Sequence, residues 1–365
     1  MGIARKAIRF IAFTFTFLTL INPLIVLKSS SSCTHHCYSD GPRVAVIMAG
    51  TMKRLLLKST VEKMLHPMVD KDGAVVDYFI SLTTARSKSY RDNSYMARIS
   101  PEIPDRIKPA TIADFIAAII DASGATTRVV SIKKTVDIDS DAMLNIRRGN
   151  AKRAHPTEDP DLRFPMFDIR SNRIQQTVIG NQNLLRMHYM IQSLWESAVQ
   201  QEKENKKKYD MVIFLRDDTY WLSDFSLKPF VERLHEIDVF VPSCDAREPP
   251  MSPLEINDHI LISGRNISDL FGNYYSRLFE LADDCTELAI KIQGRMDRGC
   301  NSEMLLKYAL DMEGAKVSKV PQSITPFQRS VNVIMPDGST GICFHKFCQS
   351  KAFPMNINNI SRCNV

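Results

Sequence analysis

Two adjacent aspartates, Asp217 and Asp218, follow Arg216 and the apolar run 211–215. Carboxylates held within a few ångströms of each other resist joint ionisation unless a cation lies beside them. A divalent metal ion removes that conflict, because Mg²⁺ and Mn²⁺ prefer hard oxygen ligands. Such an ion can bridge diphosphate oxygens and take up charge as a nucleotide leaves. The doublet is therefore a candidate metal site.

A plainer structural role is open to the same residues. Asp217 can cap a turn or pair with Arg216, and Asp218 can begin a helix or a turn. Acidic residues are common at strand ends for these reasons, so the doublet by itself favours the structural role. Its place in the predicted fold decides whether the metal interpretation stays open.

The chain around the doublet alternates strand and helix patterns. Apolar runs predict buried strands, and a period near 3.6 predicts helices, with Thr51 as the N-cap of the first. The predicted strands are 43–50, 75–84, 127–132, 209–215, 238–243, 259–263 and 315–321. The predicted helices are 51–69, 111–123, 181–208, 227–236, 268–284 and 301–314.

Repeating β–α units of this kind predict an α/β fold with a mostly parallel sheet and helices on both faces. Such folds bind ligands beyond the carboxyl ends of their strands, where Gly50 and the aspartate doublet both lie. The predicted domain spans 42–330 and includes a loop at 137–165. A cysteine-containing extension follows at 331–365.

The N-terminus has the pattern of a membrane anchor. Residues 10–27 carry no charge and would span roughly 27 Å as a helix, enough for a thin bilayer. The basic residues of the tail 1–9 predict that this end is cytosolic, which places the stem 28–41 and the domain in the lumen of the Golgi or the ER. Cleavage as a signal peptide is the alternative, although the apolar run is longer than usual for one.

Other features agree with a lumenal domain. Eight cysteines follow the apolar segment, an even count that permits disulfides whose pairing the sequence does not give. Acceptor sequons for N-glycosylation begin at Asn266 and Asn359. The formal charge of +6 falls to about +2 without the four basic residues of 1–28, too little to predict a nucleic-acid-binding surface.

Four segments resemble Golgi-type GT-A glycosyltransferase-like proteins. They are "NLLRMHYMIQSLWE", "KKKYDMVIFLRDDTYWLSD", "INDHILISGRNISDLF" and "CNSEMLLKYAL", and the resemblance covers roughly 43–321. It implies a GT-A-like fold and the transfer of a sugar from a nucleotide-sugar donor to a hydroxyl of a glycan, protein or lipid. The motif here is Asp-Asp-Thr in place of Asp-x-Asp. We favour Asp218 as the metal ligand, with Asp217 as a second ligand or an orienting group.

The resemblance also implies roles for residues outside the doublet. Gly50, Thr51 and Lys53 would pass close to the nucleotide, and Arg216 would contact phosphate, although an ordinary strand-to-helix turn and a surface ion pair are open alternatives. On the acceptor side, an inverting transfer needs a carboxylate that takes the proton of the attacking hydroxyl. Asp258 and Glu303 are candidates, with turn formation and helix capping as their structural alternatives. His345 is a candidate late metal ligand.

Two other function classes stay open. A lumenal sulfotransferase would need a basic, Ser/Thr-rich loop after its first strand, and Thr51 and Lys53 fit that loop poorly in their order. A catalytically silent protein would keep the fold as a binding or scaffolding module, because fold does not prove activity. Metal-dependent nucleotide binding separates the silent protein from the glycosyltransferase.

Overall fold

The computed structural model describes most of the predicted domain. The described residues are 41–84, 103, 109–134, 174–243, 256–278, 281, 302–334 and 340–344. The predicted anchor, the stem up to residue 40, the loop 137–165, Asn359 and His345 lie outside them. Within the described ranges no helix has the length and apolar character needed to cross a membrane.

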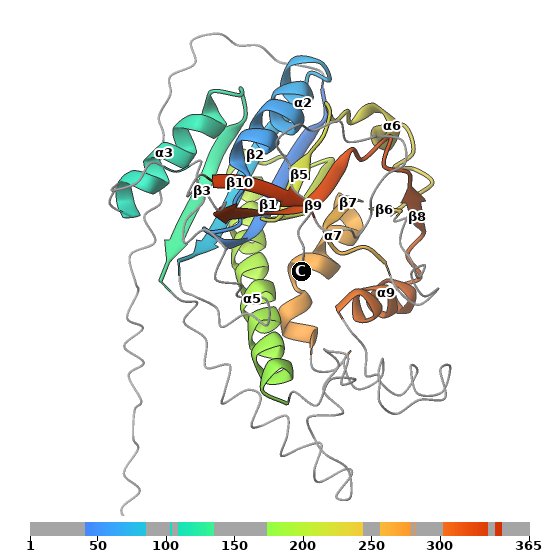
Figure 1. Ribbon diagram of the computed structural model, residues 1–365. Coiled ribbons are helices and arrows are strands. Elements are labelled where there is room, and N and C mark those ends of the chain that lie inside the picture. Colours follow the sequence, from blue (N-terminus) through green and yellow to red (C-terminus); the bar gives the residue numbers. More distant parts are fainter. Residues whose placement is uncertain are drawn as a thin grey trace, which may run out of the picture.

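A seven-stranded sheet forms the centre of the fold, in the order β3–β2–β1–β4–β7–β6–β8 (Figure 1). Neighbouring strands are parallel except at β7, which runs antiparallel to both β4 and β6. This confirms the predicted α/β class and the mostly parallel sheet. The strands are β1 (Arg43–Thr51), β2 (Val75–Thr83), β3 (Thr126–Lys133), β4 (Met211–Arg216), β6 (Val239–Pro242), β7 (Ile260–Gly264) and β8 (Val317–Val320).

Helices cover both faces of the sheet and bury two apolar clusters (Figure 1). Because side chains alternate along a strand, Val46 and Met48 of β1 face one cluster while Ala45 and Ile47 face the other. The first face carries α1 (Leu57–Thr60), the π-helical turn η1 (Val61–Leu65), α2 (His66–Asp70), α3 (Pro109–Asp121) and α6 (Lys228–Val231). The second carries α5 (Ile174–Asn205), α7 (Arg265–Gly272) and α9 (Ser302–Met312).

The segment after β1 differs from the prediction. A helix was expected to begin at Thr51, but β1 continues through Thr51, which pairs with Thr83 of β2, and helical structure begins at Leu57. The physical reason is that an N-cap hydroxyl accepts a backbone N–H, whereas the Thr51 hydroxyl and backbone N–H both donate to Asp217.

A small antiparallel sheet was not predicted. It has the order β10–β9–β5 and consists of β5 (Thr219–Trp221), β9 (Phe327–Ile334) and β10 (Thr340–Phe344). Thr219 is paired with Arg329 across β5 and β9, so this sheet brings Arg329 next to the aspartate doublet. Strand β9 also passes through residue 330, where the sequence placed the end of the domain.

The doublet lies at the point where the direction of the chain through the sheet reverses. From β1 the chain passes to β2 and β3 on one side, and it returns as β4 on the other side of β1. The ligand-binding crevices of α/β folds form at such switch points, beyond the carboxyl ends of the strands. Here those ends carry Gly50 and Thr51 from β1 and Arg216 from β4.

Candidate functional site

Asp217 is held by the end of β1 and the turn that follows it. Its Oδ2 accepts hydrogen bonds from the Thr51 backbone N–H at 2.6 Å and from the Thr51 hydroxyl at 3.1 Å. The guanidinium of Arg54 donates to both carboxylate oxygens, from Nε to Oδ2 at 2.9 Å and from Nη2 to Oδ1 at 2.7 Å. A two-point guanidinium–carboxylate contact of this kind is strong and fixes the orientation of both groups.

Gly50 makes this position of Asp217 possible. A Cβ atom at residue 50 would lie 2.0 Å from Asp217 Cγ and 2.4 Å from its Oδ2. Any larger residue would therefore displace the carboxylate. The sequence assigned Gly50 to the close approach of a nucleotide; the close approach seen in the structure is that of Asp217.

Asp218 faces a different set of cations and has no exposed surface. Its Oδ1 accepts from Arg216 Nε at 3.0 Å, and its Oδ2 accepts from Arg216 Nη2 at 3.1 Å and from Arg329 Nε at 3.0 Å. Arg54 Nη1 lies 3.6 Å from the same Oδ2. Burial alone would raise the pKa of Asp218, but these three arginines overcome it and hold the pKa well below its usual range.

Arg216 joins the doublet to Asp258, which lies just before β7. Its Nη1 donates to Asp258 Oδ1 at 3.2 Å, and Ser302 at the start of α9 donates to Asp258 Oδ2 at 3.1 Å. Burial would raise the pKa of Asp258, but Arg216, His259 and Arg329 lower it on balance. Asp258 is therefore a carboxylate at neutral pH and, in this arrangement, a weak proton acceptor.

The arginines resolve the repulsion between the adjacent aspartates. Three carboxylates, of Asp217, Asp218 and Asp258, meet three guanidinium groups, of Arg54, Arg216 and Arg329. A divalent ion needs several oxygen ligands close to it, and here every oxygen of the doublet already accepts from a guanidinium. The residues as arranged do not fit the Mg²⁺ or Mn²⁺ that the sequence suggested. Within the described residues, no three His, Cys, Asp or Glu side chains lie together so that they could hold a metal ion.

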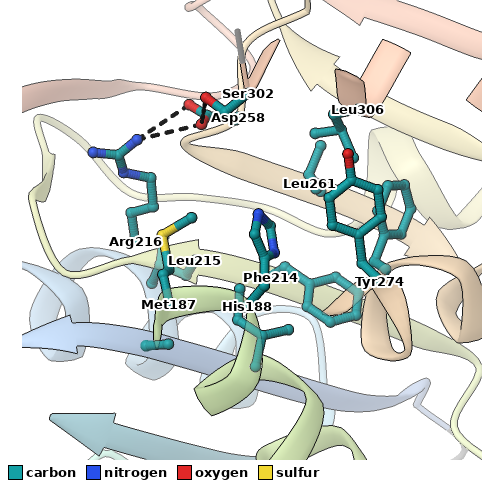
Figure 2. A pocket seen from close by; sticks show the side chains of 13 residues that line it. Met187, His188, Phe214, Leu215, Arg216, Asp258, Leu261, Tyr274, Ser302 and Leu306 are labelled. Carbon is teal, nitrogen blue, oxygen red and sulfur yellow. Dashed lines mark hydrogen bonds and ion pairs between the residues drawn. The ribbon is translucent and has the colours of Figure 1, made fainter. Parts of the chain in front are cut away.

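A cavity of about 40 Å³ lies next to Arg216 and Asp258, on the face of the sheet that α5, α7 and α9 cover (Figure 2). It has room for roughly three water molecules. Its walls are mainly apolar, and Arg216, Asp258 and Ser302 form its polar end. The apolar lining includes Ala49, Met187, Ile191, Phe214, Leu261, Phe271 and Leu306.

Two polar side chains of this cavity lack hydrogen-bond partners among the described residues. They are the Tyr274 hydroxyl, on a side chain that is only 2% exposed, and His188 Nδ1. Their rings pack edge to face, with centroids 4.7 Å apart, and Figure 2 shows both rings beside Phe214. Burial lowers the pKa of His188 to about 4 and raises that of Tyr274, so both are neutral at pH 7.

The structure brings together most of the residues that the sequence singled out. Gly50, Thr51, Arg216, Asp217 and Asp258 form one site with Asp218. Lys53 lies half-buried in the turn after β1. Glu303 lies in the first turn of α9, where its backbone carbonyl accepts from Ile256, and it does not line the cavity. His345 lies outside the described residues.

Sequence reasoning missed five residues of the site: Arg54, His188, Tyr274, Ser302 and Arg329. A weak signal existed for two of them. Arg54 follows Thr51 by three residues, and His188 interrupts the apolar stripe of the long helix between Met187 and Met190. Arg329 lies in a strand that was not predicted, so nothing in the sequence pointed to it.

Comparisons with known proteins found remote structural similarities. No family model matches the chain, and no curated protein matches it. The chain is similar to mouse xyloside xylosyltransferase 1 at a TM-score of 0.35 and 9% identity, over 77% of this chain and 86% of that one. It is similar to the glycosyltransferase GlyE of Streptococcus pneumoniae TIGR4 at a TM-score of 0.35 and 11% identity, over 76% of this chain and 46% of that one. Values this low establish neither a shared fold nor a shared activity.

Proposed function

We propose that the protein is a GT-A-like glycosyltransferase that moves a sugar from a nucleotide-sugar donor to a hydroxyl acceptor. One observation carries the proposal. Arg216 donates both to Asp218, inside a charged network at the switch point of the sheet, and to Asp258, at the polar end of a cavity. A charged network and a cavity thus meet at one residue, an arrangement that suits a transferase because donor and acceptor must be held next to each other.

The charged network is the proposed donor side. Arg54 and Arg216 have partly exposed side chains at the carboxyl ends of β1 and β4. A guanidinium can donate two parallel hydrogen bonds to phosphate oxygens, which suits a nucleoside diphosphate. In this role Thr51 and Gly50 act indirectly, because they hold Asp217, which in turn orients Arg54.

The cavity is the proposed acceptor side. An acceptor hydroxyl that enters it would find the carboxylate of Asp258 as a hydrogen-bond acceptor, with Ser302 beside it. Because Arg216 helps to keep the pKa of Asp258 low, proton abstraction by Asp258 would require this ion pair to loosen as the donor binds. The apolar walls would exclude water, which competes with the acceptor for the sugar.

Three finer statements stay predictions from the sequence. They are the metal-ligand role of Asp217 and Asp218, the anchor at 10–27, and a lumenal location in the Golgi or ER. The proposal of sugar transfer does not depend on any of them. The metal role is the one that the arrangement of arginines argues against.

A catalytically silent binding protein is the second candidate, and one observation favours it. Each oxygen of the doublet already has a guanidinium partner, so the two carboxylates need no ligand to balance their charge. A sulfotransferase is disfavoured, because the N–H and hydroxyl of Thr51, which would hold a phosphosulfate, both donate to Asp217.

Calorimetric titration of the full-length protein with UDP and with GDP, each with and without Mn²⁺, tests the proposal. We expect one nucleotide to bind, and Arg216→Lys and Asp218→Ala to weaken it at least tenfold. Lys207→Ala is the control, since its exposed side chain lies near the opposite end of β4. Hydrolysis of the matching nucleotide sugar would then separate an enzyme from a silent protein. Binding of neither nucleotide by the folded protein would contradict the donor site for both.

A further inference from the structure

The aspartate doublet is neutralised without a metal ion. Asp217 and Asp218 together carry two negative charges, and Arg54 and Arg329 bring two positive ones, the charge of a single divalent cation. Arg216 also contacts Asp218, through Nε and Nη2, and its Nη1 pairs with the third carboxylate, that of Asp258, so three positive charges meet three negative ones. The charge balance that a metal would bring to two adjacent carboxylates is thus supplied by side chains of the chain itself.

The distances between the atoms agree with this charge balance. Arg54 spans the doublet, with Nη2 2.7 Å from Asp217 Oδ1 and Nη1 3.6 Å from Asp218 Oδ2. Arg329 closes the other side of Asp218 from strand β9. A divalent ion between the two carboxylates would have to displace Arg54, and it would then lie among positive groups.

The same two arginines can meet an anionic ligand. The side chains of Arg54 and Arg329 are 24% and 22% exposed, whereas those of Asp217 and Asp218 are at most 1% exposed. A ligand that approaches this edge of the sheet therefore meets guanidinium groups before it meets carboxylates. The carboxylates hold the guanidinium planes in place, which lowers the entropy lost when phosphate oxygens bind.

We propose that Arg54 and Arg329 take the place of a divalent cation at Asp217–Asp218, so that the site binds a diphosphate group without metal. The proposal rests on the proposed function for the identity of the ligand, a nucleoside diphosphate. It goes beyond that function in assigning the positive charge to two residues that the sequence did not single out.

Two measurements on the full-length wild-type protein test the metal and the ligand separately. The first is titration with Mn²⁺ alone, followed by electron paramagnetic resonance of the free ion. We expect no bound Mn²⁺ that depends on Asp217. A bound ion that is present in the wild type and lost in Asp217→Asn would overturn the proposal, whatever the nucleotide results.

The second measurement is the affinity for UDP and GDP in EDTA and in Mn²⁺. We expect the dissociation constant of the nucleotide that binds to differ less than twofold between the two conditions. A loss of tenfold or more in EDTA would overturn the metal-free site while leaving the transferase proposal intact. If neither nucleotide binds in either condition, the proposed function is contradicted. The Mn²⁺ titration would still decide whether the doublet binds a metal ion.

Substitution of the arginines adds a gain-of-function test. Arg54→Met removes the group that spans the doublet, so we expect this variant to bind nucleotide at least tenfold more weakly in EDTA and to acquire Mn²⁺ binding. Arg54→Lys keeps the charge without the two-point contact and should show a smaller loss. The control is Arg128→Met, which removes a partner of Asp77 far from the doublet. An equal loss of nucleotide affinity in Arg54→Met and Arg128→Met would count against the proposal. If a variant fails to fold, the titrations of the wild-type protein still decide the question.

Discussion

Two buried ion-pair networks lie at opposite ends of the same parallel strands. At the amino ends, Asp77 accepts from Arg43 at 2.8 Å, from Arg128 at 2.6 Å and from the Tyr209 hydroxyl at 2.9 Å. Arg43 also stacks over the Tyr209 ring, 4.5 Å from its centroid. At the carboxyl ends, the network of three aspartates and three arginines lies beside a cavity.

The two networks differ in how completely their polar groups are paired. Among the described residues, no buried side-chain atom without a partner belongs to the amino-end network. Five such atoms lie in or next to the carboxyl-end network and its cavity, on Thr219, Ser330, His259, His188 and Tyr274. A buried polar group without a partner costs free energy, and an ordered water, an ion or a ligand can complete it. We therefore expect the amino-end network to contribute mainly stability and the carboxyl-end network to contribute binding.

Asp77→Asn should have the largest effect on stability. It leaves the guanidinium groups of Arg43 and Arg128 without their buried anion, which costs about 3–5 kcal/mol of unfolding free energy. Urea denaturation of the full-length protein measures the loss, and nucleotide affinity per folded molecule should not change. Asp224→Asn is the control: its pairs with Lys63 and Lys71 are exposed, so its loss should stay below about 1 kcal/mol. Equal losses in the two variants would remove the structural role of the amino-end network.

Gly50→Ala should have the next largest effect, at the opposite end of the strands. The added methyl group overlaps Asp217 Cγ, so the carboxylate must move away from Thr51 and Arg54. We expect a loss of about 1–3 kcal/mol in urea denaturation, the usual range for overpacking, together with weaker nucleotide binding.

Gly264→Ala is the matched control for this change. Gly264 also ends a strand, but a Cβ there would meet only Leu234 Cδ2 at an ordinary 3.5 Å. Its stability and affinity should stay close to those of the wild type. If Gly50→Ala binds nucleotide as the wild type does, the position of Asp217 has no bearing on the site.

The sequence was sufficient to predict what depends on local patterns. Continuous apolar runs predicted strands β1, β2 and β4 to within two residues at each end, because buried strands need no other signal. The doublet was found because charged residues at strand ends are visible in a pattern, and Asp258 was found through the family resemblance of the segment that contains it. Their partners were not, because the ion pair between Arg329 and Asp218 joins residues 111 positions apart.

Thr51 shows most clearly what a local sequence pattern does not predict. Its residue type predicted a helix cap, and only the tertiary position of Asp217, 166 residues away, turns its N–H and hydroxyl to another partner. The metal interpretation had the same weakness. Two adjacent carboxylates require a cation, but the sequence does not say whether that cation is a metal ion or the side chain of a distant arginine.

The pH dependence of stability should also distinguish the two ends, with a smaller effect. Burial lowers the pKa of His188 to about 4 and that of His259 to about 3, against about 6.5 in an unfolded chain. Below pH 6.5 the unfolded state therefore binds more protons than the folded state. Stability should fall between pH 6 and pH 4 by up to roughly 1.4 kcal/mol per pH unit for each histidine.

Urea denaturation across this pH range measures how steeply the unfolding free energy changes with pH. His188→Phe should reduce this slope by up to the contribution of one histidine. Met187→Leu, which changes a neighbouring wall of the same cavity without a titratable group, is the control. The lowered pKa values of Asp218 and Asp258 act in a different window. Their contribution is present above the unfolded pKa of about 3.9 and is lost only as the pH falls below it. An unchanged slope in His188→Phe would show that its imidazole takes up its proton in the folded state.

The smallest expected effect is that of removing one tyrosine hydroxyl, and its effect on stability should have opposite signs at the two ends of the strands. Tyr274→Phe removes a buried hydroxyl that has no partner among the described residues, so unfolding free energy should rise by up to about 1 kcal/mol. Tyr209→Phe removes a hydroxyl that donates to Asp77, and its unfolding free energy should fall. Urea denaturation of the pair measures both signs. If Tyr274→Phe also weakens binding of an acceptor, the fold keeps that hydroxyl unpaired for the ligand. A loss of stability in Tyr274→Phe would mean that the hydroxyl has a partner in the folded protein. The contrast between the two networks would then not hold at this residue.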